Sequence, residues 1–205
     1  MTKGHPVIAI SGIPGAGKTR ASERLALRIG AAFIPFDAFE TMTIRSPEAA
    51  LDWLNRGAPW AEMFDPALDD ALLDAAAHGP VVFETPLGRL PPAHSALITT
   101  AIWLEVDRDI ALARKLSAAL DPRDWTSAAE MSAWVAGFLD GYQRLVRPCL
   151  QMQAERVRLL SDHVLDGMAS PDVTDERIAG VWGLCDARTM PVPATGTAMQ
   201  AGVRR

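Results

Sequence analysis

The sequence is poor in the residues that build metal sites and cross-links. Its two cysteines, Cys149 and Cys185, lie far apart, and none of its four histidines has ligand spacing to another. Because a transition-metal site needs several such ligands at characteristic spacings, we expect no protein-built site of this kind. Two isolated cysteines are best interpreted as reduced thiols of an intracellular protein.

Long hydrophobic runs and an excess of basic residues are also missing. No apolar stretch approaches the length that spans a membrane, and the apolar stretch near the N-terminus is too short for a signal peptide. The 25 acidic residues outnumber the 20 basic ones, giving a net charge of −5, whereas proteins that bind nucleic acid are usually basic. We therefore expect a cytoplasmic protein that binds neither nucleic acid nor membranes, and a homodimer is left open.

A glycine-rich turn near the N-terminus carries the strongest signal. The eight residues Gly12, Ile13, Pro14, Gly15, Ala16, Gly17, Lys18 and Thr19 fit G-x-x-x-x-G-K-[ST], the phosphate-binding loop. A buried strand (VIAIS) precedes the turn, and a segment with helical spacing (TRASERLALRI) follows it. In such a turn the backbone N–H groups bind phosphate oxygens. Lys18 would neutralise the β- and γ-phosphates of ATP, and Thr19 would offer its hydroxyl to Mg²⁺.

The remainder of the chain reads as alternating strands and helices. This pattern predicts an α/β fold, a three-layer sandwich with a five-stranded, mostly parallel sheet covered on both faces. The expected strands are 7–11, 31–36, 81–84, 101–106 and 163–166. The first expected helix begins near Lys18. Further helices are expected over 47–55, 65–78, 110–120, about 127–160 with an interruption near Pro148, and 173–187. A short helix is also expected after Pro92.

Acidic residues follow three of the expected strands. Asp37 comes after the second strand, Glu84 ends the third, and Asp107 comes after the fourth. Ligands of parallel sheets bind at the carboxyl ends of the strands, so Asp37 and Glu84 are expected beside the γ-phosphate. One would deprotonate an acceptor hydroxyl and the other would hold Mg²⁺. A solvated turn residue or a helix cap is the alternative interpretation for each acid, and for Asp107 it is the favoured one.

The loop and these two acids together resemble phosphate-loop small-molecule kinases. The closest similarities are to the uridine kinase and phosphoribulokinase group and to the chloramphenicol phosphotransferase group. The resemblance implies that Asp37 is the general base. The segment Tyr142–Pro148 and the later "SDHVLDG" at 161–167 also resemble the uridine-kinase-like group. The segment after Asp37 does not match the nucleoside-binding segment of that group, so uridine is not assumed as the acceptor.

Arginines and aromatic residues supply the remaining candidates. A cation near the transferring phosphoryl group is worth a large rate factor, and we assign this role to Arg114 in an expected lid near 114–127. Arg147 is expected to bind the nucleotide. For the acceptor we propose Asp37, Glu84, Arg89 and two aromatic residues, Trp60 and Phe64, of the cluster that also holds Trp53 and Met63. The alternative is that these aromatic residues pack an inserted layer onto the core.

The sequence thus predicts one kinase domain over 1–187, with an acceptor-binding insertion near 38–66 and a disordered tail over 188–205. Its expected activity is transfer of the γ-phosphate of ATP, with Mg²⁺, to a hydroxyl of a nucleoside, a sugar or a specialised metabolite. A hydrolytic or switch NTPase is the alternative, but it would usually have an Asp at the end of the third strand, where this chain has Glu84. A nucleotide-binding module without turnover is a further alternative.

Overall fold

A single parallel sheet organises the chain in the computed structural model, which describes residues 4–42, 44–120 and 125–189. Five strands lie in the order β2-β3-β1-β4-β5, and all four pairings are parallel. The strands are β1 (Val7–Gly12), β2 (Ala32–Pro35), β3 (Val81–Glu84), β4 (Ile98–Glu105) and β5 (His163–Asp166). The predicted α/β class and the five-stranded sheet are confirmed.

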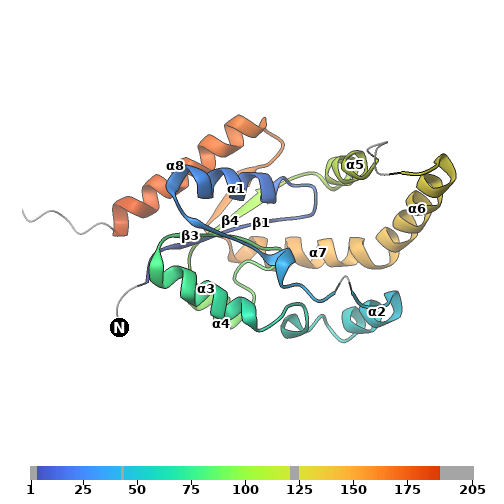
Figure 1. Cartoon of the computed structure of the whole chain (residues 1–205), viewed down its shortest axis with the longest axis horizontal. Coiled ribbons are helices and arrows are strands. Elements are labelled where there is room, and N and C mark those ends of the chain that lie inside the picture. The colour runs from blue at the N-terminus through green and yellow to red at the C-terminus, as the bar shows by residue number, and fades with distance from the viewer. Residues whose placement is uncertain (1–3, 43, 121–124, 190–205) are drawn as a thin grey trace, which may run out of the picture.

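Helices connect the strands and cover the sheet (Figure 1). The α-helices are α1 (Lys18–Ile29), α2 (Pro47–Asn55), α3 (Ala67–His78), α4 (Pro92–Leu97), α5 (Arg108–Ala119), α6 (Ala128–Gly141), α7 (Arg147–Arg156) and α8 (Pro171–Thr189). The shorter turns are η1 (Phe36–Ala38), η2 (Trp60–Glu62), η4 (Tyr142–Val146, a π-helical turn) and η5 (Arg158–Leu160). In Figure 1, α1 and α8 lie on one side of the sheet, and α3 and α4 lie on the other.

The central strand shows why both faces of the sheet need cover. All six residues of β1 are buried, and alternate residues point to opposite faces of a strand. Ile8 and Ile10 belong to the core cluster that includes Leu25 of α1. Val7 and Ala9 belong to the second cluster, which includes Leu68 of α3. A strand buried on both faces reads as a continuous apolar run, which is the pattern of "VIAIS".

Most element boundaries moved by only a few residues from their predicted places. The strand expected over 31–36 is shorter, because Phe36 turns into η1, and the strand expected over 101–106 begins earlier, at Ile98. The helix expected from Asp65 begins at Ala67, since the Asp65 carboxylate accepts the Ala67 N–H. The last helix continues to Thr189, beyond the predicted end at 187. The tail 190–205 and residues 121–124 of the expected lid lie outside the described residues.

The long helical stretch predicted over 127–160 is divided. It comprises α6, the π-helical turn η4, α7 and η5. Pro148 follows η4 closely, and a proline cannot donate the backbone hydrogen bond that an α-helix needs from that position. The predicted interruption near Pro148 is therefore confirmed, with the wider turn just before the proline. No helix in the described part of the chain has both the length and the apolarity to cross a membrane.

Candidate active site

The glycine-rich turn between β1 and α1 has the backbone of a phosphate-binding loop. Gly15 has a φ of 90°, and a Cβ there would lie 2.3 Å from the carbonyl oxygen of Ala111 in α5, so no side chain fits. Gly17 caps α1 in a left-handed conformation, with a φ of 86°. No side chain caps this helix and no acid lies in its first turn. Its N–H groups and its positive dipole end are therefore available to an anion.

Lys18 and Glu84 form a sheltered ion pair behind this loop. The Lys18 Nζ lies 3.7 Å from Glu84 Oε1, and the two side chains are 10% and 5% exposed. The same Nζ donates to the carbonyl oxygen of Ile13, at 3.4 Å. The pair forms because β3 lies beside β1 in the sheet, so the end of β3 meets the start of α1. The structure therefore places Lys18 close to a buried carboxylate.

Burial changes the protonation of both partners. It lowers the pKa of Lys18, and the negative charges of Glu84 and Asp37 oppose this shift. It raises the pKa of Glu84, where the positive charge of Lys18 is the main opposing influence. A phosphate placed between the loop and Lys18 would favour the charged form of the lysine. Burial therefore disfavours the charged form of Lys18, and a bound phosphate would stabilise that form.

This shift gives a pH-dependence to test. We expect affinity for a non-hydrolysable ATP analogue to be constant below the lowered pKa of Lys18 and to fall as pH rises through it, at a pH below the ordinary value of 10.5. The reason is that phosphate binds the protonated lysine and burial favours the neutral one. Calorimetric titrations from about pH 7 to about pH 10 measure this. In Glu84→Gln the fall should begin at lower pH, because a charge that raises the pKa of Lys18 is lost.

A cavity of about 390 Å³ opens in front of the loop and gathers the predicted residues. Lys18 and Thr19 of α1, Asp37 of η1 and Glu84 of β3 all line it, so the two post-strand acids do meet beside the loop. Four further lining residues, Phe36, Glu40, Pro86 and Lys115, had no role predicted from the sequence, and Met63 belongs to the aromatic cluster proposed for the acceptor. Glu40 lies three residues after Asp37, just beyond η1, and this second acid so close to the first is the signal that could have indicated it.

The two cations at the middle of α5 face different sides of the loop. Lys115 lines the cavity with Asp37, and its charge is among the influences that lower the pKa of Lys18. Arg114 donates instead to the carbonyl oxygen of Gly167, at 3.1 Å, and lies 3.5 Å from that of Gly15. It lines a separate cavity of about 250 Å³ with Gly15, Pro171 and others. The structure therefore does not bring Arg114 to the predicted position, and Lys115 lies there.

Arg89 lies at the opposite edge of the sheet. Its guanidinium donates to both carboxylate oxygens of Asp162, at 3.0 and 2.8 Å, and to the carbonyl oxygen of Ile98. Asp162 also accepts the N–H of Ala101. Ile98 begins β4 and Asp162 directly precedes β5, so Arg89 lies at the N-terminal ends of these strands. The phosphate loop follows the C-terminal end of β1. The predicted acceptor-binding role is thus replaced by a bridge that joins the starts of two strands.

We expect Arg89→Ala to weaken the fold and leave the site unchanged. The lost bidentate pair is 20% and 40% exposed, so the free energy of unfolding should fall by about 1 kcal/mol. Denaturant titration measures this, with Arg89→Lys as an intermediate case because lysine keeps the charge without the fork. A weaker acceptor affinity at unchanged stability would contradict the structural role.

The other predicted acceptor and nucleotide residues lie away from the cavity. Phe64 is 8% exposed and packs edge-on against Phe36, with ring centroids 5.8 Å apart. Trp60 packs against Trp53, and the Arg156 guanidinium lies 5.9 Å from its ring. The structure thus favours the packing interpretation for Trp60 and Phe64, whereas Met63 of the same cluster lines the cavity. Arg147 is exposed at the start of α7.

Oxygen ligands suited to Mg²⁺ are present, but a complete cage is not. The Thr19 hydroxyl and the Glu84 carboxylate line the same cavity. Among the described residues, no group of three or more His, Cys, Asp or Glu could hold a metal ion. Mg²⁺ is commonly held by one or two protein oxygens together with substrate phosphates and water. The residues present fit a metal that arrives with a nucleotide.

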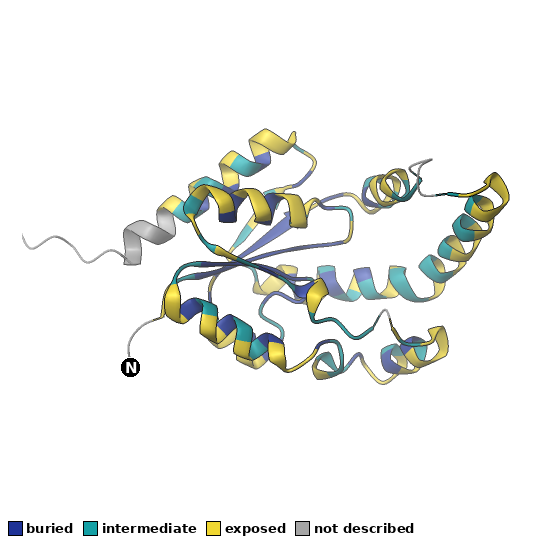
Figure 2. Cartoon of the chain, viewed as in Figure 1, coloured by how far each residue is buried: buried dark blue, intermediate teal, exposed yellow. Residues whose placement is uncertain are grey.

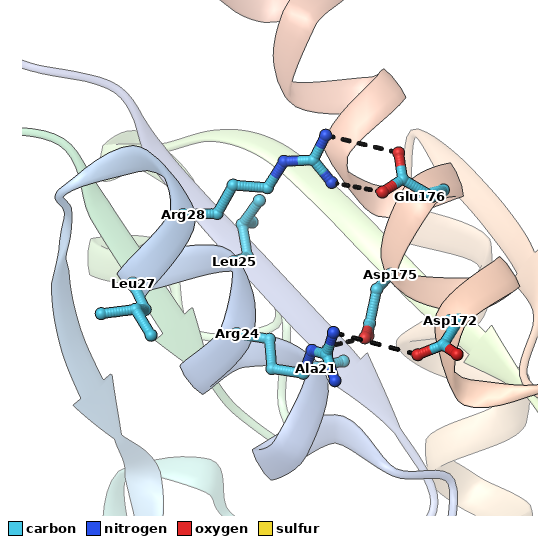
Figure 3. Close-up of a pocket in the computed structure, with 8 residues that line it drawn as sticks. All are labelled: Ala21, Arg24, Leu25, Leu27, Arg28, Asp172, Asp175 and Glu176. Carbon is cyan, nitrogen blue, oxygen red and sulfur yellow. Dashed lines mark hydrogen bonds and ion pairs between the residues drawn. The ribbon is translucent and has the colours of Figure 1, made fainter.

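A larger cavity, of about 550 Å³, lies between α1 and α8. Its arginines already have partners, because Arg24 pairs with Asp175 and Arg28 with Glu176 (Figure 3). Leu27 on the same helix is 87% exposed. The cavity lies on the flank of two helices, away from the ends of the strands. Its paired charges link α8 to α1 and offer no arrangement suited to chemistry.

Comparison with known proteins bears on the fold. Neither a protein-family model nor a curated protein matches this sequence. Among solved structures, a shikimate kinase from Acinetobacter baumannii in complex with shikimate covers 92% of this chain and 97% of its own, with a TM-score of 0.54 and 14% identity. A candidate fructose transport system kinase from Silicibacter sp. TM1040 covers 79% and 90%, with a TM-score of 0.50 and 20% identity. The fold of this chain is similar to that of phosphate-loop kinases. At these identities the likeness concerns the fold.

Proposed function

We propose that this protein is an ATP-dependent kinase that transfers the γ-phosphate to a hydroxyl of a small molecule. One observation carries the proposal: Lys18, Thr19, Asp37 and Glu84 line a single cavity in front of the glycine-rich loop. A phosphate-binding loop alone would also suit a hydrolytic NTPase. A second carboxylate in the same cavity, that of Asp37, is what an acceptor hydroxyl needs.

The loop and α1 would bind the phosphates of ATP, and Lys18 would contact the β- and γ-phosphates. We place the adenine ring of ATP in the cavity on the other side of the loop, which Arg114 and Pro171 line. A flat guanidinium and a proline ring can pack against a planar heterocycle. Mg²⁺ would neutralise phosphate charge, with Thr19 and Glu84 holding it directly or through water.

Asp37 would act on the acceptor. The acceptor oxygen attacks the γ-phosphorus, and the bond from that phosphorus to the β,γ-bridging oxygen breaks as ADP leaves. The hydroxyl proton passes to the Asp37 carboxylate. We assign to Lys115, in place of Arg114, the cation that stabilises the transferring group, because Lys115 lines the cavity that holds Asp37. The product is a phosphate monoester.

The metal assignment predicts a shift in the Mg²⁺ requirement. Glu84→Gln and Thr19→Val should each raise the Mg²⁺ concentration for half-maximal activity by roughly tenfold, because each removes one oxygen ligand or one charge. Titrating Mg²⁺ at fixed, saturating ATP measures this. Ser22→Ala, on the buried side of the same helix, is the matched control and should not shift the titration. An unchanged titration in Glu84→Gln would remove Glu84 from the metal site.

The function is tested by measuring ADP release with and without a panel of hydroxyl compounds. The two similar structures are described by names that refer to shikimate and fructose, so the panel includes these together with uridine and aromatic alcohols. We expect ATP turnover to depend on one class of acceptor. Equal turnover in the absence of every acceptor would contradict the proposal and favour a hydrolytic NTPase.

A further inference from the structure

Helix α6 carries an aromatic row that is only partly buried. None of its residues is buried (Figure 2), although its sequence "AAEMSAWVAGFLDG" is largely apolar. Trp134 and Phe138 stack one turn apart, with ring centroids 5.1 Å apart and an interplanar angle of 14°. Tyr142 continues the row, 6.3 Å from Phe138. All three side chains are half-buried, and the apolar surface that they leave in contact with water is favourable ground for an apolar ligand.

A cavity of about 430 Å³ lies between α2 and the C-terminal end of α6. Apolar side chains from both sides line it: Met42, Ala50, Leu51, Phe138, Tyr142 and Leu145. The arginines at its rim already have partners, because Arg45 pairs with Glu62 and Arg144 with Asp140. The cavity therefore offers apolar walls and an aromatic surface, which suits an uncharged ring better than an anion or a polyol.

Two glycines hold this cavity open. Gly137 and Gly141 lie one turn apart on α6, and both line it. A Cβ added at either would meet no atom within 4 Å, and neither has a positive φ. Each glycine costs a helix roughly 0.5–1 kcal/mol relative to alanine. Since the fold needs neither glycine for space or for backbone conformation, what they provide is the empty volume.

We propose that this cavity binds the uncharged aromatic or otherwise ring-bearing apolar body of the acceptor whose hydroxyl is phosphorylated at Asp37. The inference rests on the proposed kinase function and names its acceptor class. It divides the acceptor into two parts. The apolar body packs on Phe138 between α6 and α2, and a hydroxyl-bearing arm enters the cavity in front of the phosphate loop.

The chain after η1 connects the two cavities. Glu40 lines the cavity of the phosphate loop, and Met42 lines the second one. The Met42 N–H donates to the Glu40 carboxylate at 2.8 Å, which fixes this short segment. The Cα atoms of these two residues are at most about 7 Å apart, so the linings of the two cavities adjoin along this segment. A molecule with a fused ring and a short hydroxyl arm can reach from one to the other.

The test uses 2-(2-naphthyl)ethanol as the probe and fructose as its polar counterpart. Calorimetry measures binding of each to the full chain in the presence of Mg²⁺ and a non-hydrolysable ATP analogue, so no turnover is needed. Gly137→Leu should place apolar volume in the cavity from a Cβ that meets no atom within 4 Å, and leucine is a better helix former than glycine. It should weaken probe binding at least about tenfold at an undiminished melting temperature. Phe138→Ala should weaken probe binding by roughly the same factor.

Leu139→Ala is the matched control, because Leu139 is the next residue of α6 but does not line the cavity. It should leave probe affinity within about twofold. Unchanged probe binding in Gly137→Leu, or stronger binding of fructose than of the probe, would overturn the inference. So would a dimeric parent that Gly137→Leu converts to a monomer, since a second copy would then occupy the cavity. Failure of the kinase function is distinct, because it appears as ATP turnover that no acceptor stimulates.

Discussion

Lys18→Ala is expected to reduce acceptor-dependent ATP turnover by roughly 10³-fold while the chain stays folded. Among the described residues that line the cavity, the cations are Lys18 and Lys115. Lys18 follows the phosphate loop directly, whereas Lys115 lies on α5. Loss of Lys18 would remove the proposed charge-assisted contact to the β- and γ-phosphates in a site where the side chain is only 10% exposed. Steady-state kinetics and calorimetric ATP binding on the same preparation measure the effect.

The ion pair with Glu84 complicates this variant and supplies its control. Removing Lys18 leaves a carboxylate that is 5% exposed without its partner, and a buried unpaired charge is costly. The double variant Lys18→Ala/Glu84→Gln removes that charge as well. It should recover the melting temperature of the parent without recovering turnover. If the double variant recovered turnover too, the defect in Lys18→Ala would be structural, and the assignment of the phosphate site would fail.

The nucleotide side of the site could be predicted because its information is local. The loop needs glycines and a lysine at fixed spacing, and the strand before it needs apolar residues on both faces. Each requirement appears in a contiguous stretch of about two dozen residues. Asp37 and Glu84 could be added because the carboxyl ends of neighbouring parallel strands lie together whatever the loops do.

The arginines could not be placed in the same way. Arg114 and Lys115 are neighbours in sequence, but successive residues of a helix point about 100° apart. Which of the two faces the cavity depends on how α5 packs against Gly15. Arg89 follows β3 by only five residues, yet the chain returns to the other edge of the sheet before β4, and Asp162 binds the arginine there. That partner is 73 residues away in sequence.

The acceptor side depends on packing between distant segments. Trp60 and Phe64 are residue types that are common in ligand pockets. In this structure, however, Trp60 packs against Trp53 and Phe64 packs against Phe36. The aromatic row on α6 follows the spacing of one helix turn and can be read from the sequence. The cavity beside it cannot, because its other wall comes from α2, some ninety residues earlier.

Asp37→Asn is expected to leave ATP binding nearly intact at neutral pH and to reduce turnover by roughly 10²-fold or more. Asparagine keeps the size of the side chain but cannot take the proton of the acceptor hydroxyl. The structural alternative is that Asp37 caps the turn in which it lies. No side chain caps η1, and asparagine is also a good cap, so under that alternative the variant would be nearly silent. Melting temperature, ATP affinity and turnover on one preparation separate the two.

Asp107→Asn is the matched control for this prediction. Asp107 also follows a strand of the parallel sheet, is exposed, and makes no side-chain capping bond to α5. It does not line the cavity that holds Asp37. The same change of charge, three strand positions away in the sheet, should therefore leave turnover within about twofold. A folded, ATP-binding Asp37→Asn variant with the turnover of the parent would exclude Asp37 as the base. Equal losses of turnover in both variants would indicate an effect of the net charge at the carboxyl ends of the strands. If Asp37 is the general base, turnover should fall in Asp37→Asn alone.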